Sequence, residues 1–166
     1  QILVTGAAGY IGSHVVKQLL EQTTYEIIII DNLCTGFDST IQTLKSLDST
    51  NSRIKFYNQD LSEWEKVEEI FKENSIKEII HFAASLVVPE SVEQPLKYYL
   101  NNTANTASLI QTATKYGVNK FIFSSTAAVY GEPNKEDIPV SETTRTSPIN
   151  PYGSSKLFSE SVIKDT

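Results

Sequence analysis

The first twelve residues contain the feature that most constrains the fold, a short apolar run that meets three glycines. The run Ile2-Leu3-Val4-Thr5 precedes Gly6, Gly9 and Gly12, and an amphipathic helical pattern follows at once. This order places backbone N–H groups at a helix N-terminus, whose partial positive charge suits a pyrophosphate. We expect Gly6 to make the tight turn, Gly9 to let phosphates approach and Gly12 to let helix and strand pack closely. An ordinary strand-to-helix loop is the alternative.

The composition describes a globular chain and excludes several classes of protein. With 166 residues, of which 40% are hydrophobic and 20% charged, the chain can bury the core of one domain. A net charge of -6 disfavours nucleic acid as a partner, because such a partner requires a basic face. The longest apolar run, Ile27–Ile30, is too short to span a membrane. Cys34 is the only cysteine, which excludes an internal disulfide framework and thiolate metal clusters, so we expect no metal and a cytoplasmic location.

Both ends of the sequence indicate a piece of a longer polypeptide. The chain has no methionine, and the helical pattern from Leu157 to Thr166 carries no cap or stop signal. We therefore expect residues 1–166 to be the N-terminal part of a longer chain.

Apolar β-rich runs alternate with helical patterns along the whole chain, which is typical of a parallel sheet with crossover helices. Besides the first run, we expect strands at Tyr25–Ile30, Ile54–Tyr57, Glu78–Ala84 and Lys120–Ser124. Helical patterns cover residues 13–20, 40–47, 62–72 and 91–116, and a final helix begins at Asn150 and Pro151. Ser62 and Glu65 form a capping box at the start of the third pattern. The fourth pattern restarts at Pro95 and stops at Gly117. Residues 125–131 and 132–150 read as loops. The pattern predicts one α/β domain, a Rossmann-like, doubly wound parallel sheet.

Two carboxylates follow predicted strands where such a sheet holds its ligands. Asp31 ends the second strand, nineteen positions after Gly12, where a carboxylate accepts both hydroxyls of an adenosine ribose and repels a 2′-phosphate. This favours NAD over NADP, against the alternative of a solvated loop residue. Asp60 follows the third strand, and the sequence favours equally a place beside an adenine and a place at a helix N-terminus.

The strongest chemical signal is a tyrosine and a lysine four positions apart, Tyr152 and Lys156, at the start of the last helix. Residues at this spacing share a helix face, and a lysine cation favours the phenolate that a base requires. A solvated helix face is the alternative. The pair gains weight from the dinucleotide pattern and from the hydroxyl cluster Ser124-Ser125-Thr126 at the end of the fifth strand.

Taken together, these blocks resemble the extended short-chain dehydrogenase/reductase family, in particular its NAD-dependent nucleotide-sugar 4-epimerases. The resemblance covers essentially the whole chain. The blocks that carry it are Thr5-Gly6-Ala7-Ala8-Gly9-Tyr10-Ile11-Gly12-Ser13-His14, Asp31-Asn32-Leu33-Cys34, His81-Phe82-Ala83-Ala84, residues 123–131 and Asn150-Pro151-Tyr152-Gly153-Ser154-Ser155-Lys156.

The resemblance implies a role for each of these residues. Gly6, Gly9, Gly12 and the backbone N–H groups of Tyr10 and Ile11 would hold the pyrophosphate. The remaining cofactor contacts would come from Asp31, Asn32, Leu33, Cys34, Thr35 and Gly36 at the ribose, from Asp60 and Leu61 at the adenine, and from Phe82, Ala83, Ala84, Ser85, Leu86, Asn101 and Ser124 along the cofactor path. Tyr152 would be the base, Lys156 its partner on the nicotinamide ribose, and Thr126 the hydroxyl on the sugar, with Ser125 as an alternative.

The implied reaction is the interconversion of UDP-glucose and UDP-galactose through a transient 4-keto sugar. Tyr152 would take the proton of the sugar O4 while C4 gives a hydride to bound NAD, and the hydride would return to the opposite face. The alternatives are a nucleotide-sugar 4,6-dehydratase, a UDP-sugar decarboxylase, another UDP-sugar epimerase and a non-catalytic NAD-binding regulatory protein. Dehydratases carry an acidic pair just after the threonine, whereas Ala127 and Ala128 stand here. The sugar would be selected by a C-terminal substrate lobe absent from this chain, and we expect the full-length protein to be a homodimer.

Overall fold

The computed structural model describes residues 1–50 and 52–166. These residues divide into two compact units. Unit 1 consists of Gln1–Ala83 and Ser108–Ser124, and unit 2 of Ala84–Ala107 and Ser125–Thr166. No helix in the described part of the chain is long and apolar enough to cross a membrane.

Unit 1 contains one parallel sheet of five strands with the order β3-β2-β1-β4-β5. The strands are β1 (Ile2–Thr5), β2 (Ile27–Asp31), β3 (Ile54–Asn58), β4 (Glu78–His81) and β5 (Lys120–Phe123). Strand β1 pairs with β2 on one side and with β4 on the other. The strand order therefore changes direction between β1 and β4. Ligands bind at such a switch point in doubly wound sheets, outside the carboxyl ends of the strands. The predicted Rossmann-like sheet is therefore confirmed.

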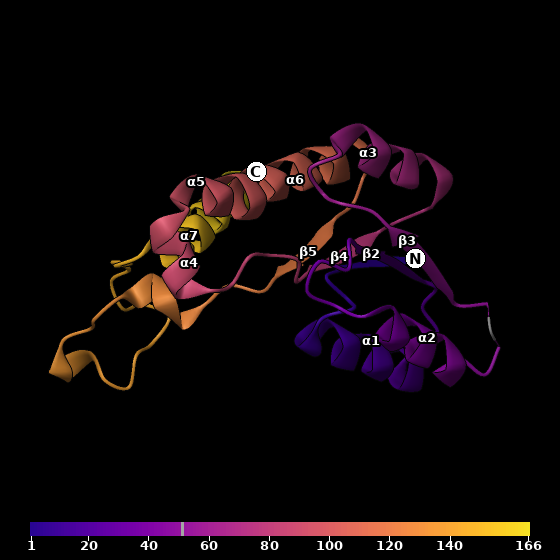
Figure 1. The fold of residues 1–166 in the computed structure, drawn as a ribbon, viewed down its shortest axis with the longest axis horizontal. Coiled ribbons are helices and arrows are strands. Elements are labelled where there is room, and N and C mark those ends of the chain that lie inside the picture. The colour runs from indigo at the N-terminus through magenta and orange to yellow at the C-terminus, as the bar shows by residue number, and fades with distance from the viewer. Residues whose placement is uncertain (51) are drawn as a thin grey trace. The chain divides into compact units, whose positions relative to one another are not determined.

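Helices cover both faces of this sheet (Figure 1). One face packs on α1 (Tyr10–Gln22) and α2 (Asp38–Leu47), and the other on α3 (Trp64–Glu73) and the second part of α6 (Asn105–Lys115). Side chains alternate along each strand, so Ile27 and Ile29 face α1 and α2, whereas Ile28 and Ile30 face α3 and α6. Because both faces are covered, β2 is apolar from Ile27 to Ile30, and each of these isoleucines contributes about 1.5–3 kcal/mol by its burial.

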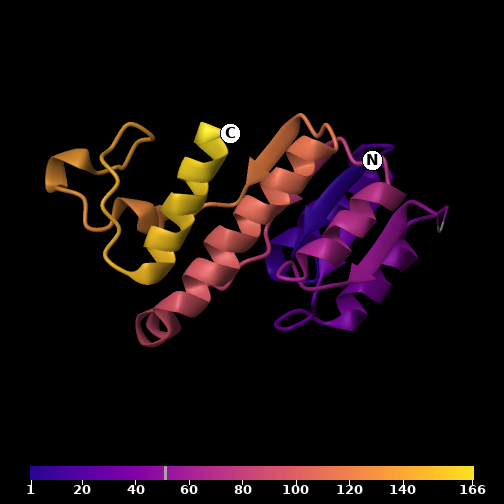
Figure 2. The ribbon, with the colours of Figure 1, turned by 90° about the horizontal axis from the view of Figure 1, so that it is seen from above.

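Unit 2 consists of helical segments and the irregular chain after β5. Helix α4 (Val88–Glu93) is followed by α5 (Pro95–Tyr98), by the π-helical turn η1 (Tyr99–Ala104) and then by α6. Helix α7 (Pro151–Asp165) packs beside α4, α5 and η1 and against the 3-10 turn η2 (Ala127–Tyr130). Figure 2 shows α7 in yellow along the pink helical run of residues 95–104. A second 3-10 turn, η3 (Lys135–Asp137), lies within the loop that the sequence predicted.

The local signals at helix ends are mostly confirmed. The Asn150 side chain accepts a hydrogen bond of 2.8 Å from the Gly153 N–H, and Pro151 occupies the first turn of α7. A new helix starts at Pro95, and Gly117 follows α6 with a positive φ of 72°. These positions behave as predicted because each signal acts within a few residues.

Three local predictions are wrong. The capping box of Ser62 and Glu65 does not form: α3 begins at Trp64, and the Ser62 hydroxyl donates to the Asp60 carboxylate at 2.6 Å. The N-cap of α3 is Glu63, one position after Ser62, so the Ser62 side chain does not occupy the capping position. Strand β4 ends at His81 and does not reach Ala84, and the segment after β5 forms the turn η2 where a plain loop was expected.

Candidate functional site

The turn between β1 and α1 is shaped by glycines that leave no room for side chains. Gly6 has φ +72°, and a Cβ added to it would lie 2.6 Å from the backbone nitrogen of Ala83. A Cβ on Gly12 would collide with the backbone of Gly6 and Ala7. The turn therefore brings β1, the first turn of α1 and the end of β4 together, as the glycine spacing predicted.

The N-terminus of α1 can receive an anion. Its N-cap is Gly9, and in the described first turn there is neither a side-chain cap nor an acidic residue. The side chains of Tyr10 and Ile11 are 82% and 55% exposed, so they do not cover the helix end. A phosphate at this position would meet backbone N–H groups and the positive end of the helix dipole.

Asp31 lies at the end of β2 with its carboxylate bound to the glycine turn. Its Oδ2 accepts a hydrogen bond of 2.9 Å from the Ala8 N–H, and its Oδ1 accepts one of 2.8 Å from the Leu33 N–H. The side chain is 9% exposed. Each carboxylate oxygen has a further lone pair, so the group can also accept hydrogen bonds from the hydroxyls of a ribose.

The loop after β2, which begins next to Asp31, is linked to Asp60 by a hydrogen bond of Asn32. The Asn32 side chain donates to Asp60 at 2.5 Å and accepts from the Cys34 N–H at 3.0 Å. Burial raises the pKa of Asp60, but hydrogen bonds from Ser62 and Asn32 outweigh burial and hold the pKa below its usual range. The predicted ribose and adenine residues Asp31 to Gly36, Asp60 and Leu61 thus follow β2 and β3 at one edge of the sheet in unit 1.

The end of β4 is fixed by a buried histidine. The Thr5 hydroxyl and His81 Nδ1 are 2.6 Å apart, and the Ala83 N–H donates to Thr5 at 3.3 Å. His81 is 1% exposed, so it is a residue of the core. Phe82 and Ala83 pack on opposite faces of the sheet, and the Ser124 N–H after β5 donates to the His81 carbonyl at 3.1 Å.

Unit 2 carries the tyrosine and lysine pair on α7. Tyr152 is half-buried in the first turn, and its ring packs edge-on against that of Tyr98, with centroids 6.3 Å apart at 86°. Lys156, one turn later, is 3% exposed, and burial lowers the pKa of this lysine to about 8. The alternative of a solvated helix face is therefore wrong for Lys156.

The π-helical turn η1 holds the segment after β4 through an asparagine that sequence reasoning missed. Asn102 accepts a hydrogen bond from the Ser85 N–H at 2.8 Å and donates to the Ser85 carbonyl at 2.9 Å and to the Ser155 hydroxyl at 3.0 Å. Asn101, which was predicted, donates to the Ser85 hydroxyl at 2.9 Å, whereas Leu86 is 64% exposed. Widened helical turns of this kind are frequent at functional sites.

Two neighbouring hydroxyls after β5 have different partners. Thr126 is the N-cap of η2, and its Oγ1 accepts a hydrogen bond of 3.2 Å from the Ala128 N–H. This bond does not use the hydroxyl hydrogen of Thr126. Ser125 donates its hydroxyl hydrogen to Oε1 of Glu160 in α7. Of the two, Thr126 is thus the better placed to donate to a substrate oxygen.

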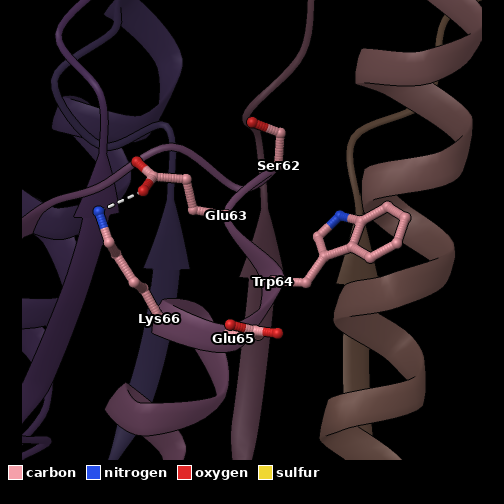
Figure 3. Close-up of a pocket in the computed structure, with 5 residues that line it drawn as sticks. All are labelled: Ser62, Glu63, Trp64, Glu65 and Lys66. Carbon is pink, nitrogen blue, oxygen red and sulfur yellow. Dashed lines mark ion pairs between the residues drawn. The ribbon is translucent and has the colours of Figure 1, made fainter.

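An open depression of about 330 Å³ lies at the start of α3 (Figure 3). Five consecutive residues, 62–66, line it, and Glu63 and Lys66 form an ion pair within it. The Trp64 ring points away from that pair and is 52% exposed. None of these five residues belongs to the predicted site, so the depression is a surface feature of one helix end.

Comparison with known proteins assigns the chain to a family. A family model described as GDP-mannose 4,6 dehydratase matches residues 3–166. The chain belongs to this family. It is an extended short-chain dehydrogenase/reductase, in agreement with the resemblance seen in the sequence.

Similar members of the family are named as epimerases. A UDP-glucose 4-epimerase of Streptococcus mutans is 44% identical over 164 residues, which are 98% of this chain and 46% of that protein. A probable UDP-arabinose 4-epimerase of rice, Oryza sativa, is also 44% identical over 99% of this chain and 40% of its own length.

Solved structures of the family superpose closely on this fold. The UDP-Glc/GlcNAc 4-epimerase of Campylobacter jejuni has a TM-score of 0.92 and 52% identity, over 99% of this chain and 48% of that one. The UDP-glucose 4-epimerase of Brucella ovis, solved in complex with NAD, has a TM-score of 0.87 and 38% identity over 99% of this chain and 46% of that one. The chain thus spans about half the length of these relatives.

Proposed function

We propose that the full-length protein is an NAD-dependent nucleotide-sugar 4-epimerase that interconverts UDP-glucose and UDP-galactose, and that residues 1–166 are its N-terminal NAD-binding part. The observation that carries this proposal is the pair on α7, a half-buried Tyr152 one turn from an almost fully buried Lys156. Relatives at 44% identity are named UDP-glucose 4-epimerase.

The residues of unit 1 fit NAD. The glycine turn excludes side chains where a pyrophosphate would approach the uncapped end of α1. The anchored carboxylate of Asp31 can accept the two ribose hydroxyls and would repel the 2′-phosphate of NADP. Asp60 and Leu61 would flank the adenine. When bound, NAD would supply the group that accepts the hydrogen of sugar C4 and gives it back.

The residues of unit 2 would carry the proton chemistry. Tyr152 would take the proton from the sugar O4 and later return it, which typically accelerates a reaction about 10²–10⁴-fold. Thr126 would donate a hydrogen bond to the same oxygen, and Lys156 would bind the nicotinamide ribose. Lys156 is almost fully buried one turn after Tyr152, so the helix itself would hold the lysine and the base on one face.

The name of the family model raises a second candidate, a 4,6-dehydratase. That reaction must also remove water from C5 and C6, for which an acidic pair follows the threonine in such enzymes. Ala127 and Ala128 occupy these positions and cannot transfer protons. A UDP-glucuronate decarboxylase is disfavoured by the same absence, and a non-catalytic NAD-binding protein would have no use for the Tyr152 and Lys156 pair.

A homodimer of the full-length protein is supported by exposed apolar side chains of unit 2. Val92, Leu96 and Leu100 follow one another at intervals of four residues and are 63%, 73% and 64% exposed. Phe158 on α7 is 50% exposed, and its ring contacts that of Tyr99. Exposed apolar side chains favour an interaction site, and a second copy of the chain would cover these. The exposed thiol of Cys34 favours a reducing cytoplasm as the location. The proposed interconversion of UDP-glucose and UDP-galactose would place the protein in galactose metabolism.

The test is turnover by the purified full-length protein without added NAD. We expect UDP-glucose and UDP-galactose to interconvert, followed by NMR of the sugar, and one NAD per chain to be released on denaturation. A 4-keto-6-deoxy product would identify a dehydratase instead. The rates with UDP-arabinose and UDP-N-acetylglucosamine, which appear in the names of relatives, would rank these sugars against UDP-glucose as substrates.

A further inference from the structure

The loop after β5 is tied to α7 by a hydrogen bond between side chains 35 positions apart. The Ser125 hydroxyl donates to the Glu160 carboxylate, and both side chains are half-buried. A hydrogen bond to an ionised acceptor is roughly twice as strong as one between neutral groups. This bond therefore holds the first residue of the loop against the second half of α7.

A second contact holds the same loop at the other end of the helix. A Cβ added to Gly153, in the first turn of α7, would lie 2.7 Å from the Ala128 carbonyl oxygen. The backbone of η2 thus lies directly on α7 next to Tyr152. Thr126 stands between the two contacts in the sequence, and its hydroxyl is bound to the Ala128 N–H.

Glu160 continues the row of residues that carries the chemistry. Tyr152, Lys156 and Glu160 follow at intervals of four, so they share one face of α7. The side chains that act on the substrate are therefore on the same helix face as the carboxylate that fixes the loop of Thr126.

We propose that Glu160 is a positioning residue that, through the hydroxyl of Ser125, fixes the hydroxyl of Thr126 relative to the phenol of Tyr152. Ser125 then serves the helix and makes no bond to the sugar. The catalytic consequence rests on the proposed epimerase function, whereas the structural coupling does not.

The catalytic test uses Glu160→Ala, Ser125→Ala and the double variant in the full-length protein, with Asp165→Ala as the control on an exposed carboxylate of the same helix. We expect each single variant to lower kcat about tenfold at unchanged KM and NAD content, because misplaced reacting groups cost rate rather than binding. The double variant should be no slower than the slower single variant, since both substitutions remove one bond. Glu160→Gln, which keeps an acceptor oxygen, should restore most of kcat.

Wild-type kcat in Glu160→Ala, or losses that multiply in the double variant, would overturn the proposal. Ser125→Ala and Glu160→Gln keep the test decisive where Glu160→Ala fails to fold.

Hydrogen exchange separates this proposal from the proposed function. The amides of Ala128, Val129 and Gly131 donate within the loop, and we expect them to exchange faster in Glu160→Ala and Ser125→Ala but not in Asp165→Ala. Unchanged exchange would refute the positioning role even in an active epimerase. A wild-type protein without activity on nucleotide sugars would refute the proposed function, and the exchange result would still decide the coupling.

Discussion

Replacing Lys156 by methionine should make the cofactor-free protein more stable at neutral pH. Lys156 is 3% exposed, and burial lowers the pKa of this lysine from 10.5 to about 8. At about 1.36 kcal/mol per pKa unit, holding the cation in the fold costs about 3 kcal/mol at pH 7. Methionine has a similar length and no charge, so Lys156→Met should raise the free energy of unfolding by up to about 3 kcal/mol.

The pH dependence gives this prediction its sign. Between pH 8 and 10.5 the unfolded chain holds more protons on Lys156 than the folded chain does, so the wild-type free energy of unfolding rises with pH across this window. The advantage of Lys156→Met should therefore shrink to about 2 kcal/mol at pH 9 and about 1 kcal/mol at pH 10.

Urea unfolding of both proteins at pH 7, 9 and 10 measures this difference. Lys164→Met is the matched control, because Lys164 is an exposed lysine of the same helix and its loss should change stability by less than about 0.5 kcal/mol at each pH. A Lys156→Met protein that is less stable than the wild type, or a difference independent of pH, would refute the assignment of a desolvated cation at this position.

Three further predictions concern other parts of the fold. Arg53 donates to four backbone carbonyls around the end of α1, so Arg53→Lys should lower the free energy of unfolding by about 2 kcal/mol. The matched change at an exposed arginine, Arg145→Lys, should leave the free energy of unfolding almost unchanged. Urea unfolding measures both, and equal effects would argue against the carbonyl contacts. Asp31→Asn should weaken NAD binding by the full-length protein about tenfold or more, measured by calorimetry. The same change at an exposed aspartate, Asp38→Asn, should not weaken it. An unchanged affinity of the Asp31→Asn protein for NAD would remove Asp31 from the ribose site. If the full-length protein is the proposed homodimer, Leu96→Asp should convert it to monomers in sedimentation. A dimer that persists in this variant would place the interface elsewhere.

The sequence predicted the sheet well because its signals are local and strong. The uninterrupted isoleucines of β2 require cover on both faces, and the glycines of the first turn admit one arrangement of strand and helix. Asn150 and Pro151 mark the start of α7 for similarly local reasons. Each of these features lies within a short stretch of the sequence.

Contacts between distant residues could not be predicted in the same way. Asn102 binds both backbone groups of Ser85 across 17 positions, and Glu160 binds Ser125 across 35, and nothing in the spacing of these polar residues indicates such partners. The capping box failed because α3 begins one residue later than the pattern indicates, with Glu63 at the N-cap, and the Ser62 hydroxyl donates to Asp60. The π-helical turn of residues 99–104, which contains Asn102, also has no sequence signature.

The phenol of Tyr152 is the group on which the proposed chemistry depends, and its removal is the most direct test. In the full-length protein, Tyr152→Phe removes one hydroxyl and leaves the ring that packs against Tyr98, whereas Tyr99→Phe removes a phenol hydroxyl elsewhere in unit 2. We expect Tyr152→Phe to lose at least about 10²-fold in kcat while it retains wild-type NAD content, and Tyr99→Phe to remain active. Wild-type turnover by Tyr152→Phe would contradict the account.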